Sequence, residues 1–139
     1  MNGDTTMENC TFCNIIDKKS DSYIIYEDDK TLVILDKAKD VDYHMLAIPK
    51  KHVKNILDCD EETLANLLLT VKKFSNYCVD SLGFEGVNIL SAANEAAGQS
   101  VSHFHIHIIP RKIKDGLNAW PSFPGAKIDL VEAFEFLKQ

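Results

Sequence analysis

Hydrophobic and polar residues along this chain alternate with two periods, one close to the 3.6-residue period of a helix and the other the two-residue period of a half-buried strand. Acidic turn residues around Asp28 and Asp29 separate the first two β-rich runs, residues 23–27 and 31–36, which indicates a hairpin. Pro49 ends the third run. The expected strands span residues 23–27, 31–36, 44–48, 87–92 and 103–109.

Helical spacing of apolar residues marks a short segment near the start of the chain and another near its end. The first covers residues 11–17, with Asn9 or Thr11 as its N-cap. The other begins at Asp129 in a carboxy-terminal tail, residues 112–139, and predicts a short helix there.

The clearest helix is expected to begin after Asp58, whose side chain caps it while Glu61 completes a capping box. Gly83 ends it. Its apolar face is expected to contain Leu64, Leu67, Leu68, Val71, Phe74, Cys78 and Leu82. The order of helix, three strands, long helix, two strands and tail predicts an α+β fold with a mostly antiparallel sheet.

Length and composition predict one globular domain over residues 1–139, with residues 1–8 disordered. The formal charge of −6 argues against binding of long nucleic acid. The first residues lack the pattern of a signal peptide, and no uncharged apolar run has the length of a membrane span. A cytoplasmic protein without membrane association or a disulfide framework is therefore expected.

Three histidines carry the strongest chemical signal in the chain. His103, His105 and His107 alternate with apolar residues, so in a strand their imidazoles point to one side. A polar edge strand or a metal site at His105 and His107 would also fit this pattern. Just upstream, the Gly98-Gln99-Ser100 loop offers backbone amides and a hydroxyl that can donate to phosphate oxygens.

These residues carry a resemblance to a known family. The segment 98–109 resembles the histidine-triad (HIT) signature, and the chain is identified as a member of the Hint-like, zinc-bearing branch. The resemblance extends over about residues 10–111, since further family blocks stand in the same order at 12–16, 26–29, 35–36 and 44–52. It implies a five-stranded sheet with one long and one or two short helices, and a homodimer whose two sheets join.

The resemblance also implies roles for individual residues. His105 matches a nucleophile that forms a covalent nucleotidyl-histidine, and His107 matches a residue that contacts the phosphate and helps the leaving group depart. Ser100 supports the phosphate or leaving group, and Asp36 holds the ribose hydroxyls. The remaining nucleotide contacts are expected from Phe12, Ile15 and Ile34 at the base and from Gly98, Gln99 and Asn94.

Cys10 and Cys13 form a C-x-x-C pair, which fits either zinc binding or two buried thiols at a helix start. The resemblance implies that they join His52 and His103 around a structural zinc ion. His44 has no role in this zinc site. It is either a partner that orients a triad imidazole or a histidine at a strand end whose own hydrogen bonds are satisfied.

Several positions depart from the family pattern or extend it. The family's asparagine eight residues before the serine is replaced by Ala92, and Asn94 stands two residues later. Lys37 stands next to Asp36 at a position where the family commonly has an aliphatic residue. Trp120 resembles a tryptophan that reaches the partner's active site in Hint dimers, or else packs locally.

The function implied by the resemblance is hydrolysis or transfer at the α-phosphorus of a purine nucleotide, with a nucleoside phosphoramidate as substrate. No organic cofactor is implied. A dinucleoside polyphosphate hydrolase would use the same residues, and Ser100 in place of threonine favours the first reading. A third reading, of another class, is a nucleotide- or zinc-binding interaction protein with incidental catalysis.

Overall fold

The computed structural model describes residues 9–119 and 121–139. The expectations for residues 1–8 and for Trp120 lie outside this part of the chain. The elements, in chain order, are α1 (Thr11–Ile16), β1 (Ile24–Glu27), β2 (Thr31–Leu35), β3 (Met45–Pro49), α2 (Glu61–Asp80), β4 (Gly86–Leu90), the 3-10 turn η3 (Glu95–Ala97), β5 (Ile106–Arg111) and α3 (Leu130–Leu137).

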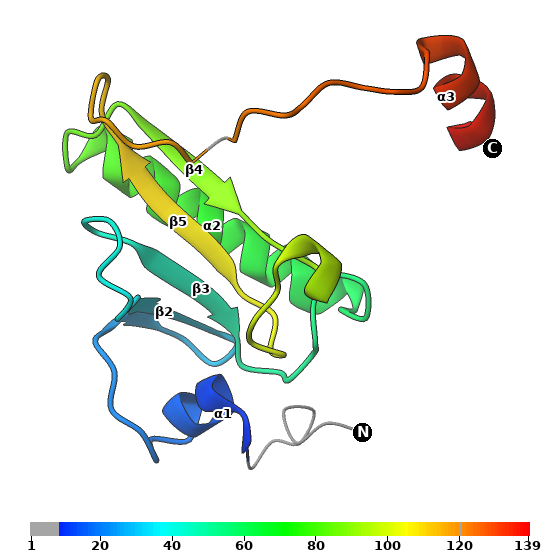
Figure 1. The fold of residues 1–139 in the computed structure, drawn as a ribbon. Coiled ribbons are helices and arrows are strands. Elements are labelled where there is room, and N and C mark those ends of the chain that lie inside the picture. Colours follow the sequence, from blue (N-terminus) through cyan, green and yellow to red (C-terminus); the bar gives the residue numbers. More distant parts are fainter. Residues whose placement is uncertain (1–8, 120) are drawn as a thin grey trace.

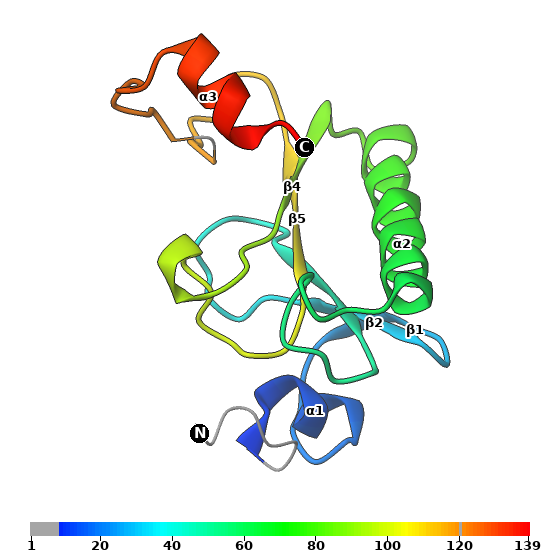
Figure 2. The same ribbon diagram turned by 90° about the vertical axis from the view of Figure 1, so that its right-hand side faces the viewer.

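The five strands form one antiparallel sheet in the order β1-β2-β3-β5-β4, as the α+β prediction requires. The long helix α2 covers one face, and α1 lies against the other (Figures 1 and 2). Each face has its own buried cluster, so the central strands β2 and β3 are buried almost throughout. This double burial explains why both strands are nearly continuous apolar runs.

The N-cap of α2 is Asp60, so the expectation of Asp58 with a Glu61 capping box was wrong. Asp60 accepts a hydrogen bond from the Thr63 amide, whereas the Asp58 carboxylate accepts from backbone amides of the turn before the helix. Either aspartate has a side chain that can cap a helix, but the Asp58 carboxylate is already bonded within the turn, so Asp60 caps α2. Leu68 and Leu82, expected on the buried face, are about half exposed, at 47% and 48%.

The first helix also begins differently from the expectation. Its N-cap is Cys10, rather than Asn9 or Thr11, and the Cys10 thiol accepts from the Cys13 amide. The sulfur is held there by long-range contacts that a local capping rule does not include.

The strand expected over residues 103–109 begins at Ile106 and continues to Arg111. The preceding segment leaves the ladder because the Phe104 amide donates to the Val53 carbonyl at 2.8 Å. The alternation nevertheless persists, since Phe104, Ile106 and Ile108 are all buried.

The amphipathic segment of the tail forms α3, with Asp129 as its N-cap. It stands away from the sheet at the end of an extended segment (Figure 1). Over the described ranges, 9–119 and 121–139, no helix combines the length and apolar character needed to cross a membrane.

Candidate functional site

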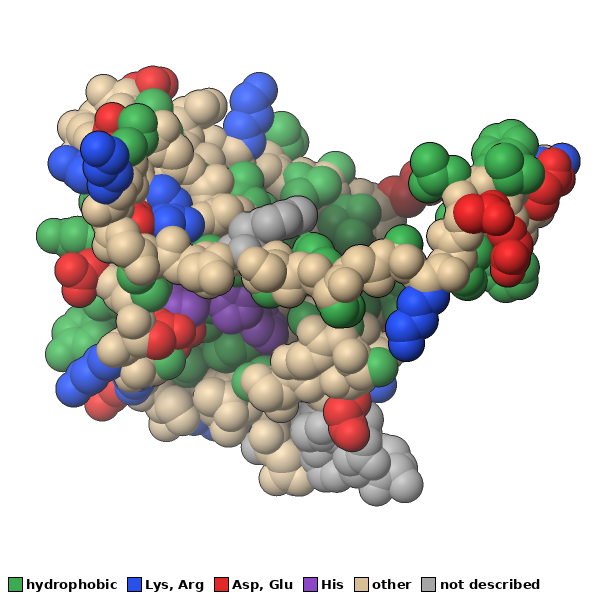
Figure 3. All heavy atoms as spheres, turned by 45° about the horizontal axis from the view of Figure 1, so that its top comes forward, with side chains coloured by type: hydrophobic (Ala, Val, Ile, Leu, Met, Phe, Trp, Pro, Cys, Tyr) green, Lys and Arg blue, Asp and Glu red, His purple; other side chains and the backbone are tan. Residues whose placement is uncertain are grey.

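His105 and His107 lie on the sheet face opposite α2. Their neighbours Ile106 and Ile108 are buried in the cluster beneath α2, so the imidazoles point the other way. The ring of Phe12, from α1, contacts the His105 ring with 5.1 Å between centroids. Figure 3 shows histidine side chains in a hollow of this face, with acidic side chains beside them.

The His105 ring is held in one orientation by the backbone. Its Nδ1 lies 2.8 Å from the His103 carbonyl oxygen, which can only accept, so Nδ1 carries the hydrogen. In the neutral ring this leaves the lone pair on Nε2. Burial lowers the pKa of His105, opposed by this hydrogen bond, which favours the uncharged imidazole at neutral pH.

His107 belongs to a chain of hydrogen bonds that ends in solvent. Its Nδ1 lies 2.8 Å from Nε2 of His44, and Nδ1 of His44 donates to Asp40 at 2.9 Å. Burial first, then the charges of His105 and His44, lower the pKa of His107 to about 4. His107 is therefore uncharged near pH 7 in the free protein.

Asp36 stands beside this chain. One carboxylate oxygen accepts from the Ala38 amide at 2.9 Å, and the other lies 3.5 Å from Nε2 of His44. Asp36, His44 and His107 thus bring three potential metal-ligand atoms within 4.8 Å of one another. The 2.8 Å separation of the two ring nitrogens is that of a hydrogen bond, so we interpret the group as a hydrogen-bonded network.

Cys10, Cys13, His52 and His103 meet at one point, and their four ligand atoms lie within 4.8 Å of one another. Sulfur-to-nitrogen separations are 3.2 Å from Cys10 to His103 and 3.2 Å from Cys13 to His52, and the two Nδ1 atoms are 3.1 Å apart. The four residues come from α1, the loop after β3 and the segment before β5. They therefore join α1 to the histidine segment.

The donor set fits a closed zinc site. Zinc bond lengths of about 2.0 to 2.3 Å in a tetrahedron place the ligand atoms roughly 3.3 to 3.8 Å apart, close to the distances found. Nε2–H of His103 donates to the Pro49 carbonyl at 2.8 Å, which leaves Nδ1 free to bind a metal. Without metal, burial first and then Cys10 raise the pKa of the Cys13 thiol to about 12.

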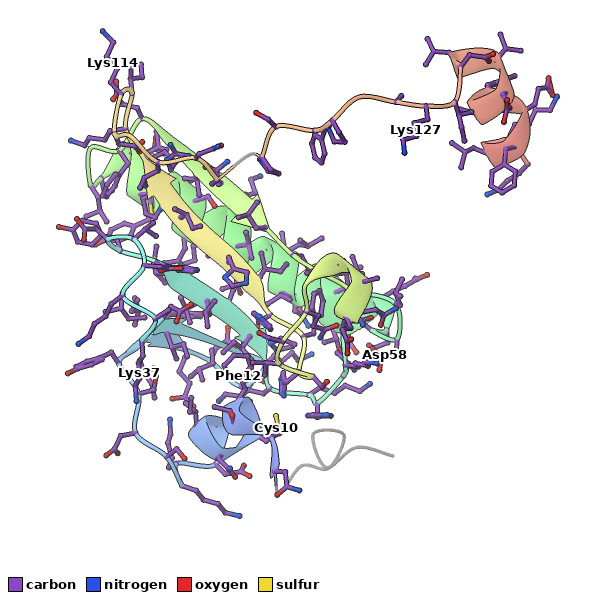
Figure 4. All side chains as sticks on the ribbon, viewed as in Figure 1. Cys10, Phe12, Lys37, Asp58, Lys114 and Lys127 are labelled. Carbon is purple, nitrogen blue, oxygen red and sulfur yellow. The ribbon has the colours of Figure 1, made fainter. Side chains whose placement is uncertain are left out.

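A cleft of about 240 Å³ opens beside Asp36. Its walls include Phe12, Ile15 and Ile34, the three residues expected at the base, and Lys37. Figure 4 shows Phe12 on the side of α1 that faces the sheet. A larger apolar groove of about 450 Å³ lies between α2 and the sheet, away from the histidine face.

The loop before the histidines is fixed by side-chain amides. Gln99 donates to the carbonyls of Lys54 and Val101 and accepts from the Asn94 amide at 2.8 Å. Both the Gln99 and Asn94 side chains accept from Asn55 at 3.0 Å. Asn94 and Gly98 adopt positive φ angles of 74° and 96°, and Ser100 is exposed. The side chains of Gln99 and Asn94 thus shape this loop from within.

Asn55 is the residue that the sequence analysis missed at this loop. It is 2% exposed, and its Oδ1 accepts from the Leu57 amide. A lone asparagine in a polar stretch gives no signal in the sequence, because its partners lie about 40 residues away. Asp40, whose carboxylate accepts from His44 four residues later, was also missed.

Asn55→Ala is expected to lower the free energy of unfolding by about 2 to 3 kcal/mol, because the buried Asn55 amide makes three hydrogen bonds, to Asn94, Gln99 and the Leu57 amide, at about 1 kcal/mol each. Urea unfolding measures this loss. Asn76→Ala is the matched control, since Asn76 is exposed on α2 and its loss should cost under about 0.5 kcal/mol. Equal stability of the two variants would contradict the assigned role of Asn55.

The fold and the site together define a class of protein: a five-stranded antiparallel α+β domain that presents neutral histidines beside a small cleft and a Cys2His2 cluster. The HIT domain family model matches residues 17–114 of this chain. The chain belongs to the HIT family, as the resemblance in the sequence indicated.

Two relatives show how far the similarity extends. An uncharacterized HIT-like protein of Borreliella burgdorferi is 42% identical over 112 residues, which cover 79% of this chain and 81% of that protein. The adenylylsulfatase HINT3 of Arabidopsis thaliana is 39% identical over 118 residues, which cover 85% of this chain and 59% of the plant protein.

Solved structures share the fold. A Streptococcus mutans protein matches 95% of this chain and 83% of its own with a TM-score of 0.83 at 31% identity. A zinc-bound histidine-triad protein of Mycobacterium smegmatis matches 82% and 83% with a TM-score of 0.77 at 32% identity. A hypothetical histidine-triad nucleotide-binding protein of Sulfolobus tokodaii matches 91% and 85% with a TM-score of 0.72 at 40% identity.

Proposed function

We propose that this protein is a nucleotide hydrolase or transferase that acts at the α-phosphorus, with a purine nucleoside phosphoramidate as its substrate. One observation carries the proposal: the His103 carbonyl holds Nδ1–H of His105, so the uncharged imidazole keeps a lone pair on Nε2, and its ring packs against Phe12, which lines the cleft. A neutral imidazole held in this way is a competent nucleophile at neutral pH.

The reaction divides into two displacements. Nε2 of His105 forms a bond to the α-phosphorus while the bond to the amine breaks, and the amine leaves with a proton. Water then attacks the phosphorus, which releases the nucleotide and restores His105. His107, whose ring joins His44, would contact the phosphate oxygens. The negative charge of a bound phosphate would raise the pKa of His107, so that its protonated ring can supply the proton that leaves with the amine.

Ser100 and the amides of its loop are proposed to donate to the phosphate or the leaving group. The hydrogen bonds of Asn55 and Gln99 support this assignment, since they hold the loop in one conformation. Fixed donors stabilise developing charge without reorganisation during the reaction.

Cys10, Cys13, His52 and His103 are proposed to hold the zinc ion. Four protein ligands fill a tetrahedral shell, so the ion would supply stability and no chemistry of its own. It would anchor α1, with Phe12, beside His105. Free cysteines at such a site suit a reducing compartment such as the cytoplasm.

Asp36 is proposed to accept hydrogen bonds from the ribose hydroxyls of a nucleotide whose base lies in the cleft. The wild-type protein should then prefer a ribonucleotide substrate to its 2′,3′-dideoxy analogue, because the analogue lacks both donors. Asp36→Asn should reduce this preference by about 2 to 4 kcal/mol, at about 1 to 2 kcal/mol for each charge-assisted bond. Specificity constants for both sugars in both proteins measure it.

The ratio of the two constants is the informative quantity, because misfolding would lower both together. Asp40→Asn is the matched control, since Asp40 bonds His44 and lies outside the lining of the cleft. This control should lower the specificity constants for both substrates and leave the ratio of the two constants unchanged. Equal specificity constants of the wild-type protein for the two substrates would contradict the proposal that Asp36 binds the ribose hydroxyls.

The leaving group distinguishes the candidate activities. The adenylylsulfatase relative favours a second candidate, an adenylyl sulfate, and a dinucleoside polyphosphate is a third. Turnover of adenosine phosphoramidate, adenylyl sulfate and a dinucleoside polyphosphate by the same preparation ranks them by kcat/KM. We expect the phosphoramidate to be fastest. Nucleotide binding without turnover of any of the three would favour the interaction protein.

A homodimer is proposed through β4. Within the part of the chain that the structure describes, this strand pairs only with β5, so one of its edges is open, and Ile89 on it is 50% exposed. Antiparallel pairing with the same strand of a second copy would satisfy the open edge and continue the sheet.

A further inference from the structure

The cleft beside Asp36, which is proposed to hold the base, has apolar walls and a polar rim. The walls are formed by four buried side chains, Phe12, Ile15, Ile34 and Leu46. The cleft of about 240 Å³ is smaller than the roughly 300 to 1,000 Å³ of a site that encloses a whole small molecule, so it suits the base rather than the whole nucleotide. Apolar walls contact the faces of any purine alike, so the rim decides which purine binds.

The rim is made by two segments of the chain that a lysine joins. Ser20, Asp21 and Ser22 come from the turn between α1 and β1, and Lys37 follows β2 beside Asp36. Asp21 and Lys37 are both exposed. The Lys37 ammonium donates to the Asp21 carbonyl at 2.9 Å, so it bridges the two segments on the solvent side of the cleft (Lys37 is labelled in Figure 4).

The Lys37 ammonium can only donate hydrogen bonds. Within the described residues, 9–119 and 121–139, it bonds to one acceptor, the Asp21 carbonyl, which leaves two of its three N–H groups for a ligand. A base that meets Lys37 must therefore present acceptors on its edge. Guanine presents two adjacent acceptors, O6 and N7, whereas adenine presents N7 beside the donor N6–H₂.

We propose that Lys37 makes this protein prefer guanine nucleotides to adenine nucleotides. The inference rests on the proposed function, because it takes the base to lie in the cleft. Lys37 donates to O6 and N7 of guanine, whereas the amino group of adenine meets the ammonium as one donor against another. The bond to the Asp21 carbonyl already restricts the lysine side chain, so its ordering on binding costs less entropy. An aliphatic residue at this position would make no such distinction.

The Asp21 carboxylate is the competing polar group at the rim. It is exposed, its residue lines the cleft, and a carboxylate accepts hydrogen bonds. Adenine can donate to it from N6 and guanine from N2, so both purines can satisfy it. The carboxylate therefore does not separate the two bases by itself. The ammonium does, because only guanine has two acceptors side by side.

Equilibrium binding of nucleoside 5′-monophosphates tests the preference without any chemistry. Isothermal titration calorimetry should give dissociation constants for GMP and IMP that are about 5- to 150-fold below that for AMP, which corresponds to roughly 1 to 3 kcal/mol for a specific contact to a base edge. Hypoxanthine, the base of IMP, keeps O6 and N7 and lacks the N2 amino group, so IMP separates recognition by Lys37 from recognition by Asp21. Equal constants for GMP and AMP would overturn the proposal, as would an IMP constant equal to that of AMP.

Lys37→Met removes the ammonium and keeps an unbranched apolar stem in its place. This variant should bind GMP and AMP with nearly equal dissociation constants. Lys39→Met is the matched control, since it removes the same charge two positions away, outside the lining of the cleft, and should keep the wild-type ratio. The ratio is the informative quantity, because both nucleotides carry the same phosphate and ribose and a general loss of attraction to phosphate cancels. A wild-type ratio in Lys37→Met would contradict the assigned role.

The base preference and the proposed function can fail separately. Selective binding of GMP and IMP without turnover of any phosphoramidate would leave the preference standing and remove the enzyme. Turnover of guanosine and adenosine phosphoramidates with equal kcat/KM, together with equal affinities for GMP and AMP, would keep the enzyme and overturn the preference. Failure of all three nucleotides to bind would overturn both.

Discussion

His105→Ala is expected to lower kcat for a nucleoside phosphoramidate by about three orders of magnitude or more, while the nucleotide still binds. The variant loses the only atom proposed to attack phosphorus, and removal of a nucleophile acts on the chemical step rather than on binding. Phe12 and the Asp36 cleft remain, so the dissociation constant for a nucleotide should change little. Single-turnover kinetics and equilibrium binding measure the two quantities separately.

The wild-type protein supplies the positive evidence for this step. Rapid mixing and an alkaline quench should trap one nucleotidyl group on the peptide that contains His105, seen as added mass. The zinc content of His105→Ala should equal that of the wild type, which shows that the fold is intact. Similar rates for variant and parent, or an adduct on another residue, would assign the nucleophile elsewhere.

The pH dependence follows from the same geometry. Burial lowers the pKa of His105, so its imidazole stays unprotonated to a lower pH than a free histidine would. The fall of kcat/KM on the acid side should therefore lie below the pKa near 6.5 of an ordinary histidine, and a pH–rate profile measures it.

Removal of zinc is expected to lower the free energy of unfolding by about 4 kcal/mol, the value for a ligand present at a thousandfold excess over its dissociation constant. The physical reason is that the ion would bind four residues that only the folded chain brings together. Urea unfolding with and without a chelator measures the loss. Elemental analysis of protein purified without chelator should give one zinc per chain.

Cysteine variants make this test specific. Cys13→Ser should lose the metal and the stability together. Cys59→Ser is the matched control, because Cys59 lies near the start of α2 outside the cluster, and this variant should keep both. A metal-free wild-type protein, or full zinc content in Cys13→Ser, would overturn the assignment.

The sequence by itself determined the elements of this protein and the face on which its chemistry lies. Side-chain periodicity is a local property, so the alternation at His103, His105 and His107 places these residues correctly even though the strand begins only at Ile106. The hairpin, the long helix and the terminal helix follow from the same local rules. Resemblance to the HIT family adds the list of residues that should meet.

The tertiary structure alone decided which partner each polar group has. Cys10 caps α1 while its sulfur lies near His103, 93 positions away in the sequence, and Asn55 joins Asn94 to Gln99 across the loop. Asp60 rather than Asp58 caps α2, because the turn before the helix occupies the Asp58 carboxylate. Which partner each polar group takes depends on competition among donors and acceptors that the fold brings together. A local sequence pattern carries no information about that competition.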